Sequence, residues 1–200
     1  FVASRMRDHL DGRCRHTDLA ILYRSNAQSR VLEEVLIRSR IPYRIYGGLR
    51  FFERQEIKDA LAYLRLLHNR DDDTSFERAV NTPTRGIGTT TMEKLREIAR
   101  ASSVSLWMAA KNASAQLGRS ANNVLQFLKL IDDLHGETRE LTLSKATELM
   151  IARTGLREHY RKEKGEQAEG RLENLDELIS AARSFELEPA APSAENPDEP

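Results

Sequence analysis

The sequence RQEIKDALAYLRLL, residues 54–67, sets the class of this fold. Its apolar residues Ile57, Leu61 and Leu64 recur three or four positions apart, which places them on one face of a helix. We interpret this stripe as a face that packs into a core, and not as a cofactor-binding surface. The sequence therefore predicts that the centre of the chain is built from packed helices.

The same helical spacing continues through the second half of the chain. The predicted helices cover residues 71–80, 89–101, a short segment after residue 105, and residues 120–134, 143–154 and 168–185. Thr89 and Ser105 are expected N-caps, because their side-chain oxygens can accept hydrogen bonds from the free amides of a first turn. Gly155 is an expected C-cap, and Trp107 is expected in the core and not on a base-stacking surface.

Residues 187–200 have a different composition from the helices before them. The stretch from Pro189 to Pro200 holds four of the six prolines and three acidic residues. It has neither a helical period nor an apolar anchor, so it cannot bury enough surface to order itself. We predict a disordered, acidic, proline-rich linker.

The segment before residue 50 shows a strand–helix–strand pattern. Residues 18–23 and 41–46 are short apolar runs that predict buried strands, and Gly47 and Gly48 end the second. Between them, residues 27–38 predict a helix with one apolar face, made of Val31, Leu32, Val35 and Leu36. This is the βαβ unit of a parallel sheet, but two strands do not make a stable one.

These patterns together predict a mainly α chain in two parts and a tail. Residues 1–50 are expected to be a short βαβ piece of an incomplete α/β domain, with a helix end at residues 2–10. Residues 51–186 are expected to form a helical domain. Residues 187–200 are the predicted linker.

The sequence NTPTRGIGT, residues 81–89, carries the clearest binding signal. Gly86 and Gly88 can adopt backbone angles that other residues avoid, and a helix is predicted to begin just after them. A turn of this kind can aim amide groups at a phosphate from the positive end of a helix, and Arg85 adds a full charge. The alternative is a tight connection between two core helices.

The sequence YRSNAQSR, residues 23–30, follows the first predicted strand. Ligands bind at this edge of open α/β sheets. Two cations and two amides, Arg24, Asn26, Gln28 and Arg30, suit a nucleic-acid backbone or base edges there. The alternative is structural: Ser25 and Asn26 cap the helix while the arginines pair with Glu33 and Glu34.

Two aromatic residues follow the second predicted strand. Phe51 and Phe52 lie beside Arg50 and Arg54, a combination that can stack on nucleic-acid bases. The same phenylalanines can instead anchor the following helix to the sheet, and we favour that interpretation.

Charge is spread unevenly along the chain although the formal net charge is zero. Residues 1–100 hold 19 Lys and Arg against 14 Asp and Glu, and residues 101–200 hold 12 against 17, so the halves carry +5 and −5. We expect one face for a polyanion and another for water or protein.

Several classes of site and location are excluded by composition. Cys14 is the only cysteine, which rules out an internal disulfide or a cysteine-rich zinc site. The five histidines show no close metal-ligand spacing. Because no apolar run is long enough for a membrane span and no signal peptide opens the chain, we expect a cytoplasmic protein without a membrane partner.

Three segments together carry a family resemblance. AILYRSNAQSRVLEE, PYRIYGGLRFFERQEIKDALAYLRL and NTPTRGIG, in this order, closely resemble the UvrD/PcrA/Rep-type superfamily-1 DNA helicases. The resemblance covers residues 18–185. Such helicases have two RecA-like domains, 1A and 2A, each with an inserted helical domain, 1B and 2B. The resemblance implies that this chain is a fragment with part of 2A and most of 2B.

The resemblance also implies DNA-binding residues. For single-stranded DNA it points to Arg24 and Asn26, with Arg30 beside them. For duplex DNA it points to the 2B loop, formed by Thr84, Arg85, Gly86, Ile87, Gly88 and Thr89. The sequence contains no GxxxxGK[ST] loop and no acidic magnesium motif. We therefore assign no catalytic residue, metal or cofactor to this chain, and expect ATP and Mg²⁺ to belong to the parent enzyme.

The function implied is that of the DNA-binding part of an ATP-dependent 3′-to-5′ helicase in DNA repair or replication. The expected partners are single-stranded and duplex DNA, and the expected location is the bacterial nucleoid within the cytoplasm. Two alternatives stay open. The 2B part could be a protein-interaction or autoinhibitory module that docks repair or transcription proteins, or the parent could be a helicase-nuclease.

Overall fold

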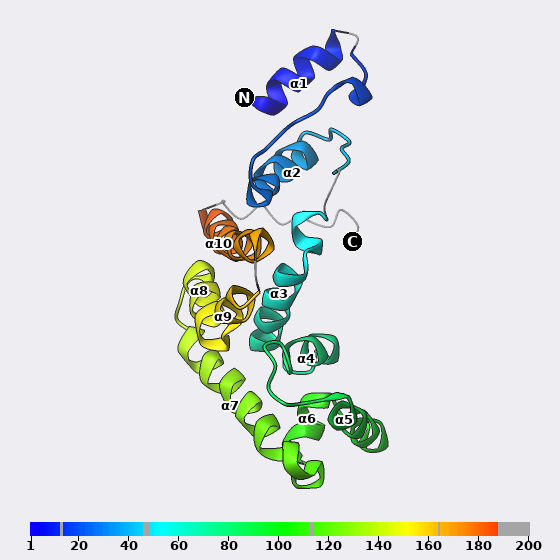
Figure 1. The fold of residues 1–200 in the computed structure, drawn as a ribbon, viewed down its shortest axis with the longest axis vertical. Coiled ribbons are helices and arrows are strands. Elements are labelled where there is room, and N and C mark those ends of the chain that lie inside the picture. Colours follow the sequence, from blue (N-terminus) through cyan, green and yellow to red (C-terminus); the bar gives the residue numbers. More distant parts are fainter. Residues whose placement is uncertain (13, 46–48, 113, 164, 188–200) are drawn as a thin grey trace, which may run out of the picture.

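The computed structural model describes residues 1–187 except residues 13, 46–48, 113 and 164. The described part is mainly α-helical, as predicted (Figure 1). Its α-helices are α1 (Val2–Asp11), α2 (Ser29–Arg38), α3 (Gln55–His68), α4 (Asp73–Ala79), α5 (Thr89–Ser102), α6 (Leu106–Asn112), α7 (Ala121–Thr138), α8 (Leu143–Thr154), α9 (Leu156–Arg161) and α10 (Glu166–Leu187). Short 3₁₀ turns are η1 (His16–Asp18), η2 (Asn26–Gln28), η3 (Phe51–Glu53) and η4 (Ser114–Ser120).

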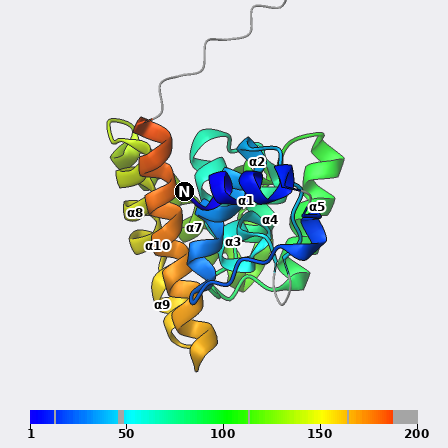
Figure 2. The same ribbon diagram turned by 90° about the horizontal axis from the view of Figure 1, so that it is seen from above.

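Helix α3 is the centre of the helical part. It packs against α4, α7, α8 and α10. The molecule is elongated, with α1 and α2 at one end and α5 and α6 at the other (Figure 1). From above, α1 and α2 lie over α3 while α10 runs along one side (Figure 2).

The core contains an aromatic cluster contributed by four helices. Phe76 lies edge-on to Phe127 at 5.5 Å between ring centroids and edge-on to Trp107 at 6.4 Å. Tyr63 packs edge-on to Phe127 at 6.4 Å. Edge-to-face contacts at these separations add to the free energy gained by burying the rings. The prediction that Trp107 belongs to the core is confirmed, because its side chain is buried.

The predicted strands are not found in the described residues. Residues 19–23 and 41–45 have no regular structure, and Tyr46, Gly47 and Gly48 lie outside the described residues. A strand is defined by hydrogen bonds to a neighbouring strand, and these two segments exchange none. The predicted βαβ unit is therefore not formed by the described residues, and Leu22 is 95% exposed instead of buried.

Helix α2 buries only part of the face that its apolar pattern predicts. Val31 and Val35 are about half exposed, at 49% and 41%. The buried residues are Ser29, Arg30, Glu33 and Leu36. No sheet among the described residues covers the rest of the apolar stripe, and polar contacts join this helix to the helical part.

Arg54 provides most of those polar contacts. Its guanidinium donates to the carbonyl oxygens of Leu49 at 3.3 Å and Asn26 at 2.9 Å. It also donates to the hydroxyl of Ser29 at 2.6 Å and to the side-chain oxygen of Asn174 on α10 at 2.8 Å. Burial lowers the pKa of this guanidinium. Arg54 thus joins residues 1–50 to α10 and is not available for base stacking.

Of the other sequence predictions, the one for the two phenylalanines before α3 is met by only one of them. Phe51 is buried, so it anchors the start of α3, whereas Phe52 stays more than half exposed.

Gly155 has a left-handed backbone, with φ 79°, and ends α8, as predicted. Ser105 caps α6 by accepting from the amide of Met108 at 3.3 Å. The predicted division into residues 1–50 and 51–186 stays a prediction, and the predicted linker lies outside the described residues apart from Leu187, the last residue of α10.

Candidate nucleic-acid interface

In the loop between α4 and α5, Gly86 and Ile87 are held by contacts with the protein, whereas Gly88 faces solvent. At its centre Gly86 is left-handed with φ 71°, a conformation that favours glycine. A Cβ at this position would also meet the side-chain nitrogen of Asn123 at 2.9 Å. Ile87 is buried in the core and holds the loop down. The first glycine is therefore required by the fold.

Gly88 is different because nothing in the fold requires it. Its φ of −85° suits any residue, and a Cβ there would meet no atom within 4 Å. It forms the N-cap of α5, so the cap is Gly88 and not the predicted Thr89, and no side chain caps this helix. The absent side chain leaves the start of the helix open to solvent.

The first turn of α5 offers free donors. The amides of Thr89 and Thr90 meet no protein acceptor within the described part of the chain. No acidic residue occupies this turn. Helix N-termini with free amides and positive dipole ends attract phosphates. Thr84, Gly86, Gly88 and Thr89 are exposed on the same loop.

The Arg85 side chain is directed into the protein. Its Nη1 donates to the carbonyl oxygens of Ala79 at 3.1 Å and Pro83 at 3.0 Å, and its Nη2 donates to that of Thr154 at 3.0 Å. The sequence predicts that this guanidinium binds a phosphate directly. In the structure its hydrogen-bonding capacity is largely used by backbone oxygens, so the loop's backbone, not this side chain, is what faces outward.

Two aromatic rings complete the surroundings of Arg85. Its guanidinium carbon lies 5.7 Å from the ring centroid of Tyr63 and 5.5 Å from that of Phe127, distances at which a cation is attracted to a ring face. Burial raises the pKa of the Tyr63 phenol above its ordinary value of 10.0. The hydroxyl therefore stays protonated, and it shares its hydrogen between the carbonyl oxygens of Ala79 and Thr82 at 2.9 and 2.6 Å.

In the segment of residues 23–30 one arginine is free and one is not. Arg24 is exposed, and its guanidinium has no acceptor within the described residues. Arg30 is buried and ion-paired with Glu34 at 2.7 Å and with Glu177 of α10. The structural alternative therefore describes Arg30, while Arg24 keeps the geometry needed to meet an anion.

Asn26 is exposed like Arg24 and is also held by the protein like Arg30. Its side chain is exposed, while its carbonyl oxygen is held by Arg54. Ser25 caps the η2 turn by accepting from the amide of Ala27 at 3.4 Å. Gln28 is exposed, but its side-chain oxygen accepts from the amide of Arg24 at 3.1 Å and so helps to order the segment. Arg24 and Asn26 remain the outward-facing pair.

The structure does not bring the two candidate segments together. The η2 turn leads into α2 near one end of the molecule, and the glycine loop leads into α5 toward the other, with α3 between them (Figure 1). Any DNA that touched both would have to follow the long axis.

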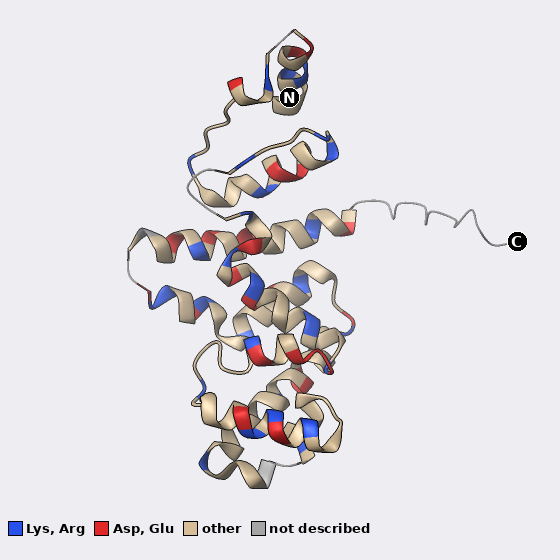
Figure 3. Cartoon of the chain, turned by 90° about the vertical axis from the view of Figure 1, so that its right-hand side faces the viewer, with Lys and Arg blue, Asp and Glu red and all other residues tan. Residues whose placement is uncertain are grey.

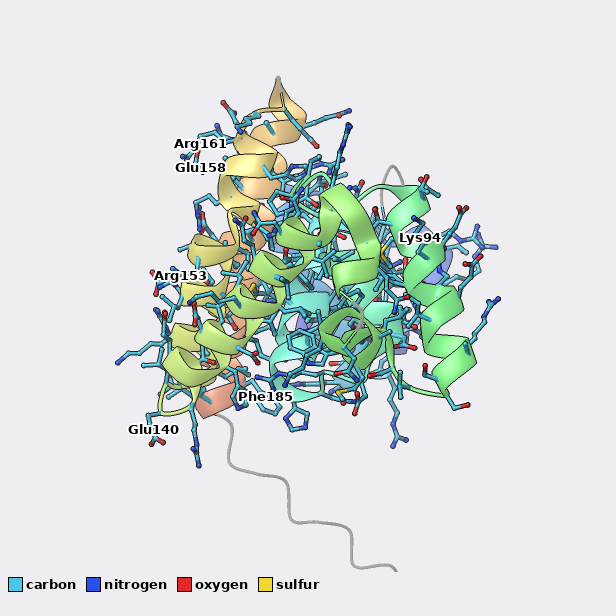
Figure 4. The ribbon with its side chains drawn as sticks, turned by 90° about the horizontal axis from the view of Figure 1, so that it is seen from below. Lys94, Glu140, Arg153, Glu158, Arg161 and Phe185 are labelled. Carbon is cyan, nitrogen blue, oxygen red and sulfur yellow. The ribbon has the colours of Figure 1, made fainter. Side chains whose placement is uncertain are left out.

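The expected separation into a basic and an acidic face is not seen. Lys and Arg alternate with Asp and Glu on the helices (Figure 3). Arg96 pairs with Glu77 at 2.6 Å and Arg153 pairs with Glu137 at 2.8 Å. In the view from below, Lys94 projects from α5 on the opposite side of the molecule from Arg153 (Figure 4). Charges of both signs are thus interspersed along the helices, although the two halves of the sequence carry opposite net charge.

Sequence reasoning missed the residues that hold these segments in place. They are Arg54, Tyr63, Asn81, Glu177 and Asn174. Only Asn81 had a local signal, because it stands inside the glycine-loop motif and asparagine side chains accept hydrogen bonds from nearby amides. The others lie far from their partners in sequence.

Two kinds of feature are absent from the part of the chain that the structure describes. No group of three or more His, Cys, Asp or Glu side chains there could hold a metal ion. No helix among the same residues has the length and apolar character to cross a membrane.

The amino-acid sequence of this chain matches a known class of helicase domain. The family model of the UvrD-like helicase C-terminal domain matches residues 1–196. The chain therefore belongs to the UvrD-like helicase C-terminal domain family, which confirms the resemblance seen in its motifs.

Its relatives are bacterial DNA helicases. The chain is 53% identical over 188 residues to DNA helicase II of Haemophilus influenzae and 51% identical to DNA helicase II of Escherichia coli, covering 92% of this chain in each case. It is 41% identical over 189 residues to the ATP-dependent DNA helicase PcrA of Bacillus subtilis, covering 93% of this chain. The chain spans 26% of the length of each of these relatives.

Proposed function

We propose that this chain is the DNA-contacting part of an ATP-dependent 3′-to-5′ DNA helicase that acts in DNA repair or replication. The family membership and the helicase relatives support the class. The single observation that carries the DNA contact is the open N-terminus of α5, where a Cβ at Gly88 would meet no protein atom within 4 Å. A bacterial cytoplasmic location, at the nucleoid, follows from this function.

In this proposal the glycine loop binds the phosphates of duplex DNA without reading sequence. The amides of Thr89 and Thr90 supply hydrogen bonds, and the missing Cβ of Gly88 lets the DNA backbone approach. Thr84 adds an exposed hydroxyl beside them. Phosphate contacts of this kind position DNA but carry no sequence information.

Titrations of duplex DNA test this contact. Gly88→Val places a branched side chain in the approach path and should weaken duplex binding by about tenfold or more, since blocking one phosphate contact site removes roughly 1.5–3 kcal/mol. Gly136→Val on α7 is the matched control, because a Cβ there also meets no atom within 4 Å. Equal duplex affinity in both variants would remove the loop from the DNA interface, and a loss confined to single-stranded DNA would reassign it.

Arg24 and Asn26 are proposed to hold single-stranded DNA. Arg24→Ala should weaken single-strand binding more than duplex binding, because a charge-assisted phosphate contact contributes roughly 1.5–3 kcal/mol. Arg100→Ala, which removes an exposed arginine from α5, controls for the general effect of charge. Unchanged single-strand affinity with a loss of ATP turnover in the parent would instead place Arg24 against the nucleotide.

ATP and Mg²⁺ are proposed to bind parts of the parent enzyme that lie outside this chain. The chain alone should therefore release no phosphate from ATP, with or without single-stranded DNA. Turnover that stays with the chain through further purification would contradict the assignment.

A docking role is the second candidate, and one observation favours it. An apolar cavity of about 400 Å³ lies between α2, α8 and α10, lined by residues such as Ile37, Phe52, Leu143 and Phe185. Phe185 stands at its exposed end (Figure 4). Such a surface suits a repair or transcription protein, or another part of the parent. DNA affinity that does not change with salt would favour this role, because phosphate contacts release counterions.

A further inference from the structure

Arg85 connects the glycine loop to a helix that lies far away in the sequence. Its Nη1 reaches Ala79 and Pro83, at the end of α4 and within the loop, while its Nη2 reaches Thr154, the last residue of α8. A cation is stabilised at the C-terminus of a helix, where carbonyl groups lack partners and the dipole is negative. The loop is therefore attached to α8 through one guanidinium.

Asn81 holds the same loop from inside. Its side-chain oxygen accepts from the amide of Arg85 at 2.7 Å and from the amide of Ile87 at 3.4 Å. These two bonds enclose Gly86, whose left-handed backbone turns the chain toward Gly88. The shape of the loop is thus determined by contacts within the protein.

We propose that Arg85 is a positioning residue that sets the loop for DNA and does not itself bind phosphate. The inference rests on the proposed duplex contact of this loop. Turning the guanidinium outward would leave the carbonyl oxygens of Pro83 and Thr154 without this donor, and unpaired buried polar groups are costly. A loop held in its binding shape before DNA arrives loses less entropy on binding.

Replacement by lysine distinguishes positioning from direct contact. A lysine keeps the positive charge but has no planar fork to reach carbonyl groups in two directions. Arg85→Lys should therefore weaken duplex binding about as much as Arg85→Ala, by about tenfold or more. A direct phosphate contact predicts that lysine largely restores affinity, and that result would overturn the proposal.

Asn81→Ala provides a second variant that removes no charge. It should weaken duplex binding in the same way, because the amides of Arg85 and Ile87 lose their acceptor. Each variant is first checked for helical circular dichroism and is titrated below its melting transition. A purely structural role would lower melting temperature but leave the affinity of the folded protein unchanged, so normal affinity in both folded variants also overturns the proposal.

Amide hydrogen exchange in the full chain without DNA separates this inference from the proposed function. Arg85→Lys should speed exchange at the amide of Ile87 by about tenfold or more, since opening of the loop becomes less costly. Unchanged exchange there would contradict the positioning role. Faster exchange, together with normal duplex affinity for Gly88→Val, would leave Arg85 as the loop's anchor and reject the loop as a DNA contact.

Discussion

Residues 1–50 and residues 51–187 both contain amphipathic helices, but the second region buries its apolar faces far more completely than the first. Helices α3, α4, α6 and α7 enclose a common core, whereas α2 leaves Val31 and Val35 about half exposed and buries Leu36 beside three polar residues. A helix satisfies its backbone hydrogen bonds within itself, and its neighbours in this chain are other helices. The apolar runs of the first region have no neighbouring strand to pair with, which shows that amphipathic pattern alone does not secure burial.

The largest expected difference lies in the cost of removing an apolar side chain. Phe127→Ala should lower the free energy of unfolding by about 3–5 kcal/mol, because it leaves a cavity beside Tyr63 and Phe76. Val35→Ala on α2 should cost less, about 1 kcal/mol or below, since that residue is 41% exposed and loses little buried apolar area. Urea unfolding measures both. Equal costs would show that α2 belongs to the same core.

The junction between the two regions should be the next most sensitive place. Arg54→Met keeps the length of the side chain but removes its hydrogen bonds to Asn26, Ser29 and Asn174. We expect a loss of about 2–3 kcal/mol in the free energy of unfolding, since hydrogen bonds to a buried charged group are affected.

Arg24→Met is the matched control for this junction, because its guanidinium is exposed and has no acceptor within the described residues. Its unfolding free energy should stay within about 0.5 kcal/mol of the parent's. Arg54→Met should also make residues 23–38 more accessible to limited proteolysis than the control does. Identical cleavage patterns would mean that Arg54 does not join the two regions.

Substitutions of the two glycines of the loop should lower the free energy of unfolding by different amounts, because their backbone geometries differ. Gly86→Ala should cost about 1–2 kcal/mol, because an alanine is strained at a positive φ and its Cβ would press on Asn123. Gly88→Ala should cost less, about 0.5 kcal/mol, the difference between glycine and alanine at a helix N-cap. Thermal melts of the two variants give the comparison, and a larger loss for Gly88 would make that residue structural after all.

The smallest effect concerns an acidic helix cap. Asp72 caps α4 by accepting from the hydroxyl and amide of Ser75 at 2.7 and 3.0 Å, and these bonds lower the pKa of its carboxyl below 3.8. Its stabilisation is therefore present above pH 3.8 and lost as the pH falls through the lowered pKa. Asp72→Ala should cost about 0.5–2 kcal/mol at pH 7 and less in acid.

Asp18 is the matched carboxyl in the first region. Hydrogen bonds from Arg15 lower its pKa in the same direction, but both side chains are exposed. Asp18→Ala should leave the unfolding midpoint unchanged across the same pH series. A pH-dependent loss for Asp18 and none for Asp72 would reverse the comparison between the regions.

The sequence by itself determined the mainly helical class, the place of most helices and the glycine loop as a connection into α5. Helical spacing and capping residues are local signals, so Ile57, Leu61 and Leu64 suffice to predict α3, and Gly155 to end α8. The family also follows from the sequence, because long motifs such as NTPTRGIG keep their order. Helix α9 was not predicted, since its six residues are too few to show a period.

Only the tertiary structure decided what the arginines do. Arg24, Arg30, Arg54 and Arg85 look alike in sequence, yet one is free, one is paired with carboxylates and two hold backbone carbonyl groups. Their partners, such as Glu177, Asn174 and Thr154, lie between 69 and 147 residues away. An arginine's role depends on which acceptors the fold brings within about 3 Å, and no local pattern contains that information.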